Sequence, residues 1–537
     1  MVENCNAENL YKIVVSHLKD VAGMTDYEIA TKLVCVGADG ASVMQGHRTG
    51  LCVRLQTTVA PYMLPIHCMA HRMNLAYKMV SNHENVAKLE DLIRELHAYM
   101  SSSPKRFLEF QKFAIGITDG KKLLKDVETR WISLYEPACR VREEYPSLVG
   151  FMHKYHHEVD RARDLFRLTD LETLLTLVGI LPMLKEINTL MKHAQGRLIY
   201  IVDFIRMRKM VCQSLDILYC SQDSFDAPVF ENWKDLLDLK NPNTFLRFNI
   251  HDHLCITVNG REIPMHILQK RQDITGSERE DVPVTRNLFE SVIVETRIKL
   301  KQISETLSSE IRERFCKDKI LEEMGVMNPN FWNTEGGRAD FVRKHFHKSM
   351  GTIMEQFTKT SELKGMEIKG ILNTDLLKFQ STNFATTMRN QYKNLDQPSE
   401  SGAIARLWRG IYQSSILQED ISEYLRLYEL CQTMILGSVE DERVFSALSF
   451  IKSKLRNRLD KNLESCMRCY VSRYSIETFS FDRAIAHWNS LCERRGVNNT
   501  ATSTNIPNLE SVIGSSSHST EDNIEFDKAI DNGLFQL

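Results

Sequence analysis

The run LVCVGADGASVMQG, residues 33–46, is the stretch that most constrains how this chain folds. Its first four residues are apolar and have the length of a short buried strand. Small residues end this run, and Asp39 follows them. The sequence therefore predicts a strand over Leu33–Ala38 with a carboxylate at its carboxyl end.

The segments that follow predict a βαβα order. Residues 41–60 have helical spacing with an interruption near Gly46, and YMLPIHC at 62–68 is a second short apolar run. MAHRMNLAYKMV at 69–80 is helical again. This order implies neighbouring parallel strands joined by a right-handed crossover, and ligands of such sheets bind beyond the carboxyl ends of the strands. Asp39 is predicted to lie at that edge.

Composition argues against several classes of protein. Hydrophobic residues at 43% and charged residues at 26% are typical of a protein that buries a core, and 537 residues predict two or three lobes. The formal net charge of −2 means that any contact with nucleic acid needs a local basic patch. No uninterrupted apolar run has the length of a membrane span, and the first ten residues do not resemble a secretory signal. We expect an intracellular protein with reduced cysteines and no membrane partner.

Residues 85–435 are predicted to be overwhelmingly helical. The clearest apolar periodicity lies at 170–194, 291–315 and 420–436. Loop signals interrupt it at 271–283, 327–337 and 394–402. The predicted domains are a partial α/β region at 1–140, a helical domain at 141–400, a C-terminal helical region at 401–490 and a disordered, Ser/Thr/Asn-rich tail at 491–537.

A second informative stretch lies at residues 438–471. Val444, Leu448, Ile451 and Leu455 share one face of a predicted helix, and Asp460 has the residue type of an N-cap for the next helix. On periodicity alone, these are two amphipathic helices of a bundle whose Lys and Arg side chains are solvated.

The residues in this stretch carry more than their periodicity. DERVFSALSFIKSKLRNRL, residues 441–459, resembles the C-terminal signature of hAT-superfamily transposases, roughly SERxFSxxxxIxxxxRNRL. GADGASVMQG resembles the second-aspartate motif of that family, IHCMAHRMNLA its C-x-x-H motif, and DVETRWISLYE its T-R-W-x-S-x-Y motif. The four motifs occur in the family's order and cover most of residues 33–475.

The resemblance implies an α/β protein with a large all-α insertion. Its ribonuclease H-like fold would be incomplete here, interrupted by the helical domain and closed by C-terminal helices that support dimerisation. The residues matching the dimerisation region are Phe445, Ile451, Leu455, Arg456, Asn457, Arg458 and Leu459. A homodimer or higher oligomer is therefore the expected assembly.

In that family an Asp-Asp-Glu set holds two divalent metals, because in-line phosphoryl displacement develops charge on both the attacking and the leaving oxygen. Asp39 matches the second aspartate and Glu442 the glutamate. Arg130 and Trp131 match the motif that the family uses near the DNA end. Cys68 and His71 match a pair that supports the active site in that family.

The first aspartate of that set has no counterpart. Only 38 residues precede Asp39, and they are predicted to form an amphipathic helix over 7–24 and a linker. Asp20 and Asp26 do not end an apolar strand run, and no BED-type zinc finger is present. We therefore expect Asp39 and Glu442 to be vestigial and the chain to need no cofactor, with Mg²⁺ or Mn²⁺ bound only if activity is retained. The alternative is a fragment of an active transposase whose first aspartate lies upstream.

Each candidate residue also has a structural interpretation. Asp39 can cap the helix that starts near Ser42, Trp131 can be a core residue, and Glu442 can be favoured at a helix start by the macrodipole. Cys68-x-x-His71 has ligand types that suit zinc, with Cys466-x-x-Cys469 as the other half, although buried cysteine usually only packs.

Three classes of function follow from these residues. The first is an interaction protein that self-associates through residues 405–475, and the second is the metal-dependent transposase. The third, a ubiquitin-like-modifier ligase, has no RING-type Cys/His array to support it. Basic runs at 204–210 and 452–458 predict at most weak, salt-sensitive DNA binding. The resemblance implies a nuclear protein; without it, a cytoplasmic one is expected.

Overall fold

The computed structural model describes most of the chain up to residue 434. The described ranges are 6–125, 134–194, 200–241, 244–270, 279–315, 319–333, 338–394, 403–434 and 480–491, with Gly437, Leu448 and Ile451 as single positions. The chain divides into two compact units, Met1–Ser446 and Ala447–Leu537. Within the second unit the described helix is α22 (Phe481–Leu491), and the predicted tail after residue 491 lies outside the described residues.

The first unit begins with the predicted βαβα order. Its elements are α1 (Ala7–Ser16), the π-helical turn η1 (His17–Val21), α2 (Asp26–Lys32), β1 (Cys35–Ala38), α3 (Ser42–Gln45), α4 (Leu51–Thr58), β2 (Leu64–His67) and α5 (Met69–Ser81). β1 and β2 pair in parallel, from Cys35 opposite Leu64 to Ala38 opposite His67. The prediction of two parallel strands with helical connections is confirmed. The predicted helix over 7–24 is divided into α1 and η1, and the predicted helical break at Gly46 separates α3 from α4.

A small apolar cluster holds these N-terminal elements together. Ile29 of α2 and Leu51, Cys52 and Leu55 of α4 are buried, and the apolar face of α1 packs against them. α2 starts at a capping box in which Thr25 and Glu28 each accept a hydrogen bond from the other's backbone N–H. Asp20 lies in η1 and Asp26 opens α2, so neither carboxylate follows a strand.

Helices make up most of the rest of the first unit. They are α6 (Glu84–Ser101), α7 (Pro104–Ala114), α8 (Tyr135–Tyr155), α9 (Asp160–Leu168), α10 (Leu171–Ala194), α11 (Ile201–Cys220), η3 (Pro228–Phe230), α12 (Glu231–Leu237), α13 (Arg286–Phe315), α14 (Lys319–Glu323), η4 (Met324–Met327), η5 (Pro329–Trp332), α15 (Ala339–Phe357), α16 (Thr374–Lys393), α17 (Ala403–Tyr412), α18 (Ser415–Asp420) and α19 (Ser422–Thr433). The three helices predicted from the strongest periodicity correspond to α10, α13 and α19.

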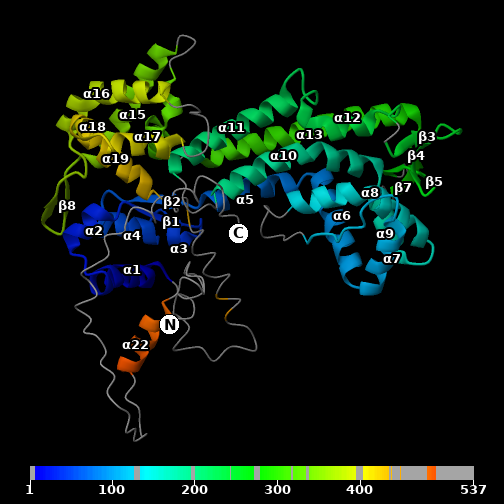
Figure 1. The fold of residues 1–537 in the computed structure, drawn as a ribbon, viewed down its shortest axis with the longest axis horizontal. Helices are drawn as coiled ribbons and strands as arrows, with labels where there is room; N and C mark the ends of the chain where they lie inside the picture. The colour runs from blue at the N-terminus through cyan, green and yellow to red at the C-terminus, as the bar shows by residue number, and fades with distance from the viewer. Residues whose placement is uncertain are drawn as a thin grey trace, which may run out of the picture. The chain divides into compact units, whose positions relative to one another are not determined.

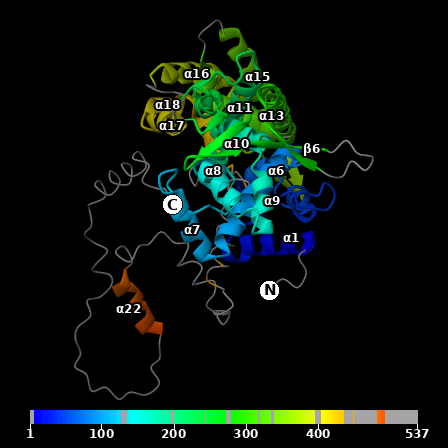
Figure 2. The ribbon, with the colours of Figure 1, turned by 90° about the vertical axis from the view of Figure 1, so that its right-hand side faces the viewer.

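The structure departs from the helical prediction at short antiparallel strands. They are β3 (Leu246–Phe248), β4 (Leu254–Val258), β5 (Arg261–Pro264), β6 (His266–Lys270), β7 (Arg279–Pro283), β8 (Ser361–Leu363) and β9 (Met366–Ile368). The stretch 271–283, predicted to be a loop, therefore ends in a strand. The region 141–400, expected to be all-α, is mostly helical but contains these strands. β3–β5 lie at the far end of α10, α11 and α13 from β1 and β2, and β6 extends from the same end in the turned view (Figures 1 and 2).

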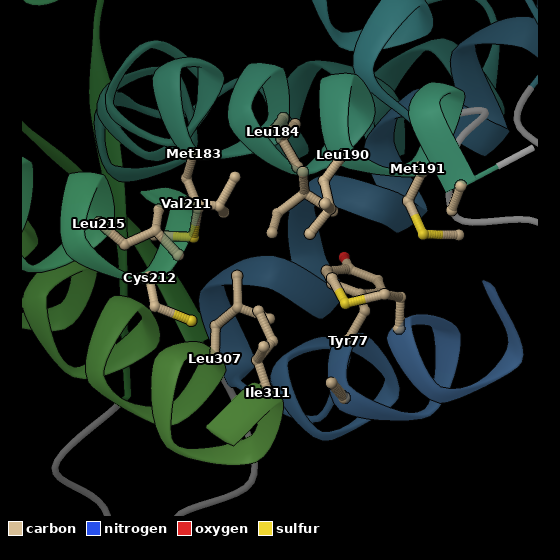
Figure 3. Packing of buried hydrophobic residues seen from close by; sticks show 14 of the residues in the cluster. Tyr77, Met183, Leu184, Leu190, Met191, Val211, Cys212, Leu215, Leu307 and Ile311 are labelled. Carbon is tan, nitrogen blue, oxygen red and sulfur yellow. The ribbon is translucent and has the colours of Figure 1, made fainter. Parts of the chain in front are cut away.

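The main core forms around α10, which α8, α11 and α13 cover. Figure 3 shows Met183, Leu184, Leu190 and Met191 of α10 with Val211, Cys212 and Leu215 of α11, Leu307 and Ile311 of α13, and Tyr77 of α5. α10 is long and apolar enough to cross a membrane, but 83% of its most apolar window is buried inside the protein. Its hydrophobicity is therefore explained by its central position in the core.

One buried carboxylate fixes the turn between α7 and α8. Glu144 of α8 is fully buried and accepts hydrogen bonds from the backbone N–H groups of Gly120 and Lys121, each at 3.0 Å, and from the Thr118 hydroxyl. Within the described part of the chain these two amides donate to no other acceptor, so the carboxylate satisfies them in place of water.

We expect Glu144→Ala to lower the free energy of unfolding by roughly 2–4 kcal/mol, because two buried backbone donors lose their acceptor. The matched control is Glu143→Ala, since Glu143 is 42% exposed and only pairs with Lys121 and Arg140 at the surface. That control should change stability by no more than about 0.5 kcal/mol. Urea unfolding of the full chain measures both, and equal effects of the two substitutions would contradict the prediction.

Candidate functional site

The carboxyl ends of β1 and β2 bring two of the sequence motifs together. Ala38 lies opposite His67, and the Cys68 N–H donates to the Ala38 carbonyl at 2.7 Å. Asp39 and Cys68 therefore leave the sheet side by side, as the parallel register requires. This is the edge at which the sequence predicts a ligand site.

Asp39 is exposed at the start of the turn that leads to α3. Its Oδ1 accepts a hydrogen bond from the Ala41 N–H at 3.1 Å, so the side chain closes the turn two residues on. The N-cap of α3 is Ala41, which makes no side-chain capping bond. Asp39 therefore does not cap α3. Its side chain instead closes the turn that precedes the helix.

His67 fills the space in front of that turn. A Cβ atom on Gly40 would lie 2.8 Å from both Cε1 and Nε2 of the His67 ring, so the backbone comes this close only because residue 40 is glycine. The His67 and His71 rings lie 5.6 Å apart with their planes at 35°. Nε2 of His67 is buried, with no hydrogen-bond partner in the described part of the chain.

The charge state of His67 follows from this packing. The pKa of His67 is lowered to about 4, mainly by burial and also by the positive charge of Arg72, while Asp39 acts in the opposite direction. The imidazole is therefore neutral at pH 7. A neutral ring with a buried nitrogen can accept a proton or a hydrogen bond, but it carries no charge to balance Asp39.

Cys68 and His71 occupy the first turn of α5. Cys68 is fully buried, and its carbonyl accepts the first helical hydrogen bond, from the Arg72 N–H at 3.0 Å. His71 is partly exposed on the same turn. A Cβ on Gly437 would lie 2.5 Å from the Cys68 Cα, so the backbone at residue 437 crosses directly over Cys68.

The segment after α19 therefore returns to this sheet edge. The Cys35 thiol donates to the Thr433 carbonyl at 3.1 Å, and Gly437 then meets Cys68. Residues 433 and 437 thus lie beside the start of β1 and just beyond the end of β2. Almost 400 residues of sequence separate these contacts from the strands they touch.

Two arginines, Arg72 of α5 and Arg208 of α11, contact the ring of Phe315 at the end of α13. Nη1 of Arg72 donates to the Arg314 carbonyl at 3.2 Å, and its guanidinium is 5.3 Å from the Phe315 ring. Arg208 of α11 lies over the same ring at 4.9 Å and pairs with Glu322 of α14. The end of α13 is therefore clamped between α5 and α11 by cation–π contacts.

The structure brings together Asp39, Cys68 and His71 of the predicted site. Most of the other predicted residues lie outside the described residues. They are Arg130, Trp131, Glu442, Phe445, Leu455, Arg456, Asn457, Arg458, Leu459 and the Cys466/Cys469 pair. Ile451 is described and buried. Within the described ranges, no group of three or more His, Cys, Asp or Glu side chains is placed to hold a metal ion.

Two members of the site were missed from the sequence. Gly40 and His67 pack against each other where the two strands end, yet neither was a candidate residue. The available signal was position alone, because His67 precedes Cys68 at the end of a predicted strand and Gly40 follows Asp39.

No protein-family model matches the chain. The hAT resemblance therefore rests on the four sequence motifs.

The shifted pKa of His67 predicts a pH dependence of stability. An unfolded histidine titrates near pH 6.5, whereas His67 in the folded chain titrates at about 4. Between these values the unfolded chain binds a proton that the folded chain does not, so the free energy of unfolding falls as the pH is lowered from about 6.5 to 4.

We expect His67→Gln to make this fall shallower, and His47→Gln, at an exposed position, to leave it unchanged. Urea unfolding at several pH values measures the slopes, and an NMR titration of the His67 ring checks the midpoint directly. A His67→Gln slope identical to that of the wild type would refute the assignment.

Proposed function

We propose that this chain is a hAT transposase-derived protein with an incomplete ribonuclease H-like fold that, by itself, does not cleave DNA. Its function on this proposal is protein interaction, through self-association of the C-terminal region at 401–490. DNA binding is weak and salt-sensitive, and the protein is nuclear.

The observation that carries the proposal is the meeting of distant segments at one sheet edge. Asp39 and Cys68 belong to two different hAT-like motifs, and they leave adjacent parallel strands. Gly437 lies against Cys68, and Glu442 of the C-terminal motif follows it by five residues. An insertion that interrupts an α/β domain has to return to that domain in this way.

The proposed lack of DNA cleavage rests on the carboxylates. Two cations that share an in-line displacement need carboxylate oxygens on both, and the motifs supply only Asp39 and Glu442. Asp26 opens α2 and pairs with Lys19 at 2.8 Å, while Asp20 lies within η1. Neither carboxylate lies at the end of a strand that pairs with β1. Among the described residues, the neutral His67 ring lies close enough to Asp39 for the carboxylate to influence its pKa.

Self-association is the first test of the proposal. We expect size-exclusion chromatography with light scattering at micromolar concentration to give at least twice the chain mass of 62.1 kDa. Leu455→Asp should shift the protein towards monomer, because it places a charge on the apolar face of the predicted helix.

The matched control is Ser453→Asp, which adds the same charge on the opposite face of that helix. Circular dichroism melting of both variants separates dissociation from unfolding. A wild-type chain that is strictly monomeric at this concentration would sink the interaction hypothesis.

Metal binding tests the catalytic part of the proposal. We expect calorimetric titration with Mn²⁺ to show weak or undetectable binding, unchanged by Asp39→Ala, because two carboxylates without a third do not bridge two cations. Saturable binding that Asp39→Ala abolishes would instead favour a retained transposase centre.

A further inference from the structure

A cavity of about 230 Å³ lies well away from the sheet edge, between α8, α10, α12 and the chain segment that precedes β3. Its apolar lining comes from Leu174 and Val178 of α10, Leu236 of α12, and Phe245. Phe245 is held in place because its ring stacks on Tyr145 of α8 at 6.4 Å. Nothing in the proposed function uses this cavity.

Two opposite charges line the same cavity. Arg142 of α8 donates from Nη2 to Oδ1 of Asn232 on α12, and Asp235 lies one turn further along α12. Side chains three residues apart on a helix have Cβ atoms roughly 5–6 Å apart. The guanidinium and the Asp235 carboxylate therefore both lie along the Asn232–Asp235 face of α12, although among the described residues no ion pair joins them.

This arrangement defines what the cavity can bind. A phosphate or another anion would meet the Asp235 carboxylate, and a simple cation would meet the Arg142 guanidinium. A purely apolar molecule would make no use of either charge at the cavity rim. A ligand that carries a negative and a positive group close together, with an apolar remainder, can pair with both charges and pack on the apolar residues, beside the polar Asn241 and Thr244 that also line the cavity.

We infer that the cavity binds a small zwitterion, an α-amino acid with an apolar side chain. Its carboxylate pairs with Arg142, its ammonium group with Asp235, and its side chain packs on Leu174, Val178 and Phe245. Pockets for drug-sized ligands enclose about 300–1,000 Å³, so a cavity of this size suits a smaller molecule.

The test uses isothermal titration calorimetry of the full chain with L-leucine and L-phenylalanine. We expect saturable binding at one site with a dissociation constant of about 1 mM or tighter for at least one of them. N-acetyl-L-leucine lacks the ammonium group and L-leucinamide lacks the carboxylate. Each should bind at least about tenfold more weakly than L-leucine, since each loses one charge-assisted contact.

Variants assign the binding to this cavity. Arg142→Met keeps the aliphatic stem and removes the guanidinium, and Asp235→Asn removes the negative charge. Each should weaken binding of the amino acid by at least about tenfold. Glu231→Gln is the matched control, because Glu231 is an exposed carboxylate one turn before Asp235 and does not line the cavity.

Circular dichroism melting confirms that each variant is folded, as expected for substitutions of side chains at the cavity rim. Three outcomes overturn the inference. They are no binding of either amino acid at 10 mM, binding of either single-charge analogue as tight as that of L-leucine, and binding that survives both Arg142→Met and Asp235→Asn.

Discussion

α10 is apolar almost all the way round, so it is stable in water only where other elements cover each of its faces. α8, α11, α13 and α6 provide that cover, and α5 reaches the same core through Tyr77. The two carboxylates at the start of α10 each have a lysine partner. Asp170 is fully buried, pairs with Lys88 and accepts the Thr173 N–H, and Glu172 pairs with Lys299 at 2.5 Å. The long helices of the first unit are thus arranged around one buried helix.

The two-stranded sheet, by contrast, is too small to form a core of its own. A pair of four-residue strands needs helices packed against it for stability. The α1–α4 cluster covers part of it, and α5 joins it to α13 and α10. This explains why the site is built from contacts across the chain, such as His67 over Gly40 and Gly437 over Cys68, and not from one continuous motif.

Sequence reasoning found the elements whose signal is local. β1, β2, α5, α10 and α13 follow from apolar runs and helical spacing, and Asp39 was placed correctly at a strand end. The strands β3–β7 were missed because they lie between segments of strong helical periodicity, and the whole region was predicted to be helical. A local signal existed in Asn259-Gly260, where φ values of 50° and 72° form the β4–β5 turn. The clamp on Phe315 had no such signal, because Arg72 and Arg208 meet that ring only through tertiary packing.

The contacts between early and late segments bear on how the α/β region is delimited. The Tyr62 hydroxyl lies 2.6 Å from the Lys359 carbonyl and 2.9 Å from that of Ile368, so the β8–β9 hairpin is bonded to the residues that enter β2. Arg72 is bonded to the end of α13, and Cys35 to the end of α19. Each of these bonds satisfies a backbone carbonyl of the later segment with a side chain of the first eighty residues. The first eighty residues and segments as late as residue 437 therefore belong to one compact unit, because side chains and backbone of the two are packed together.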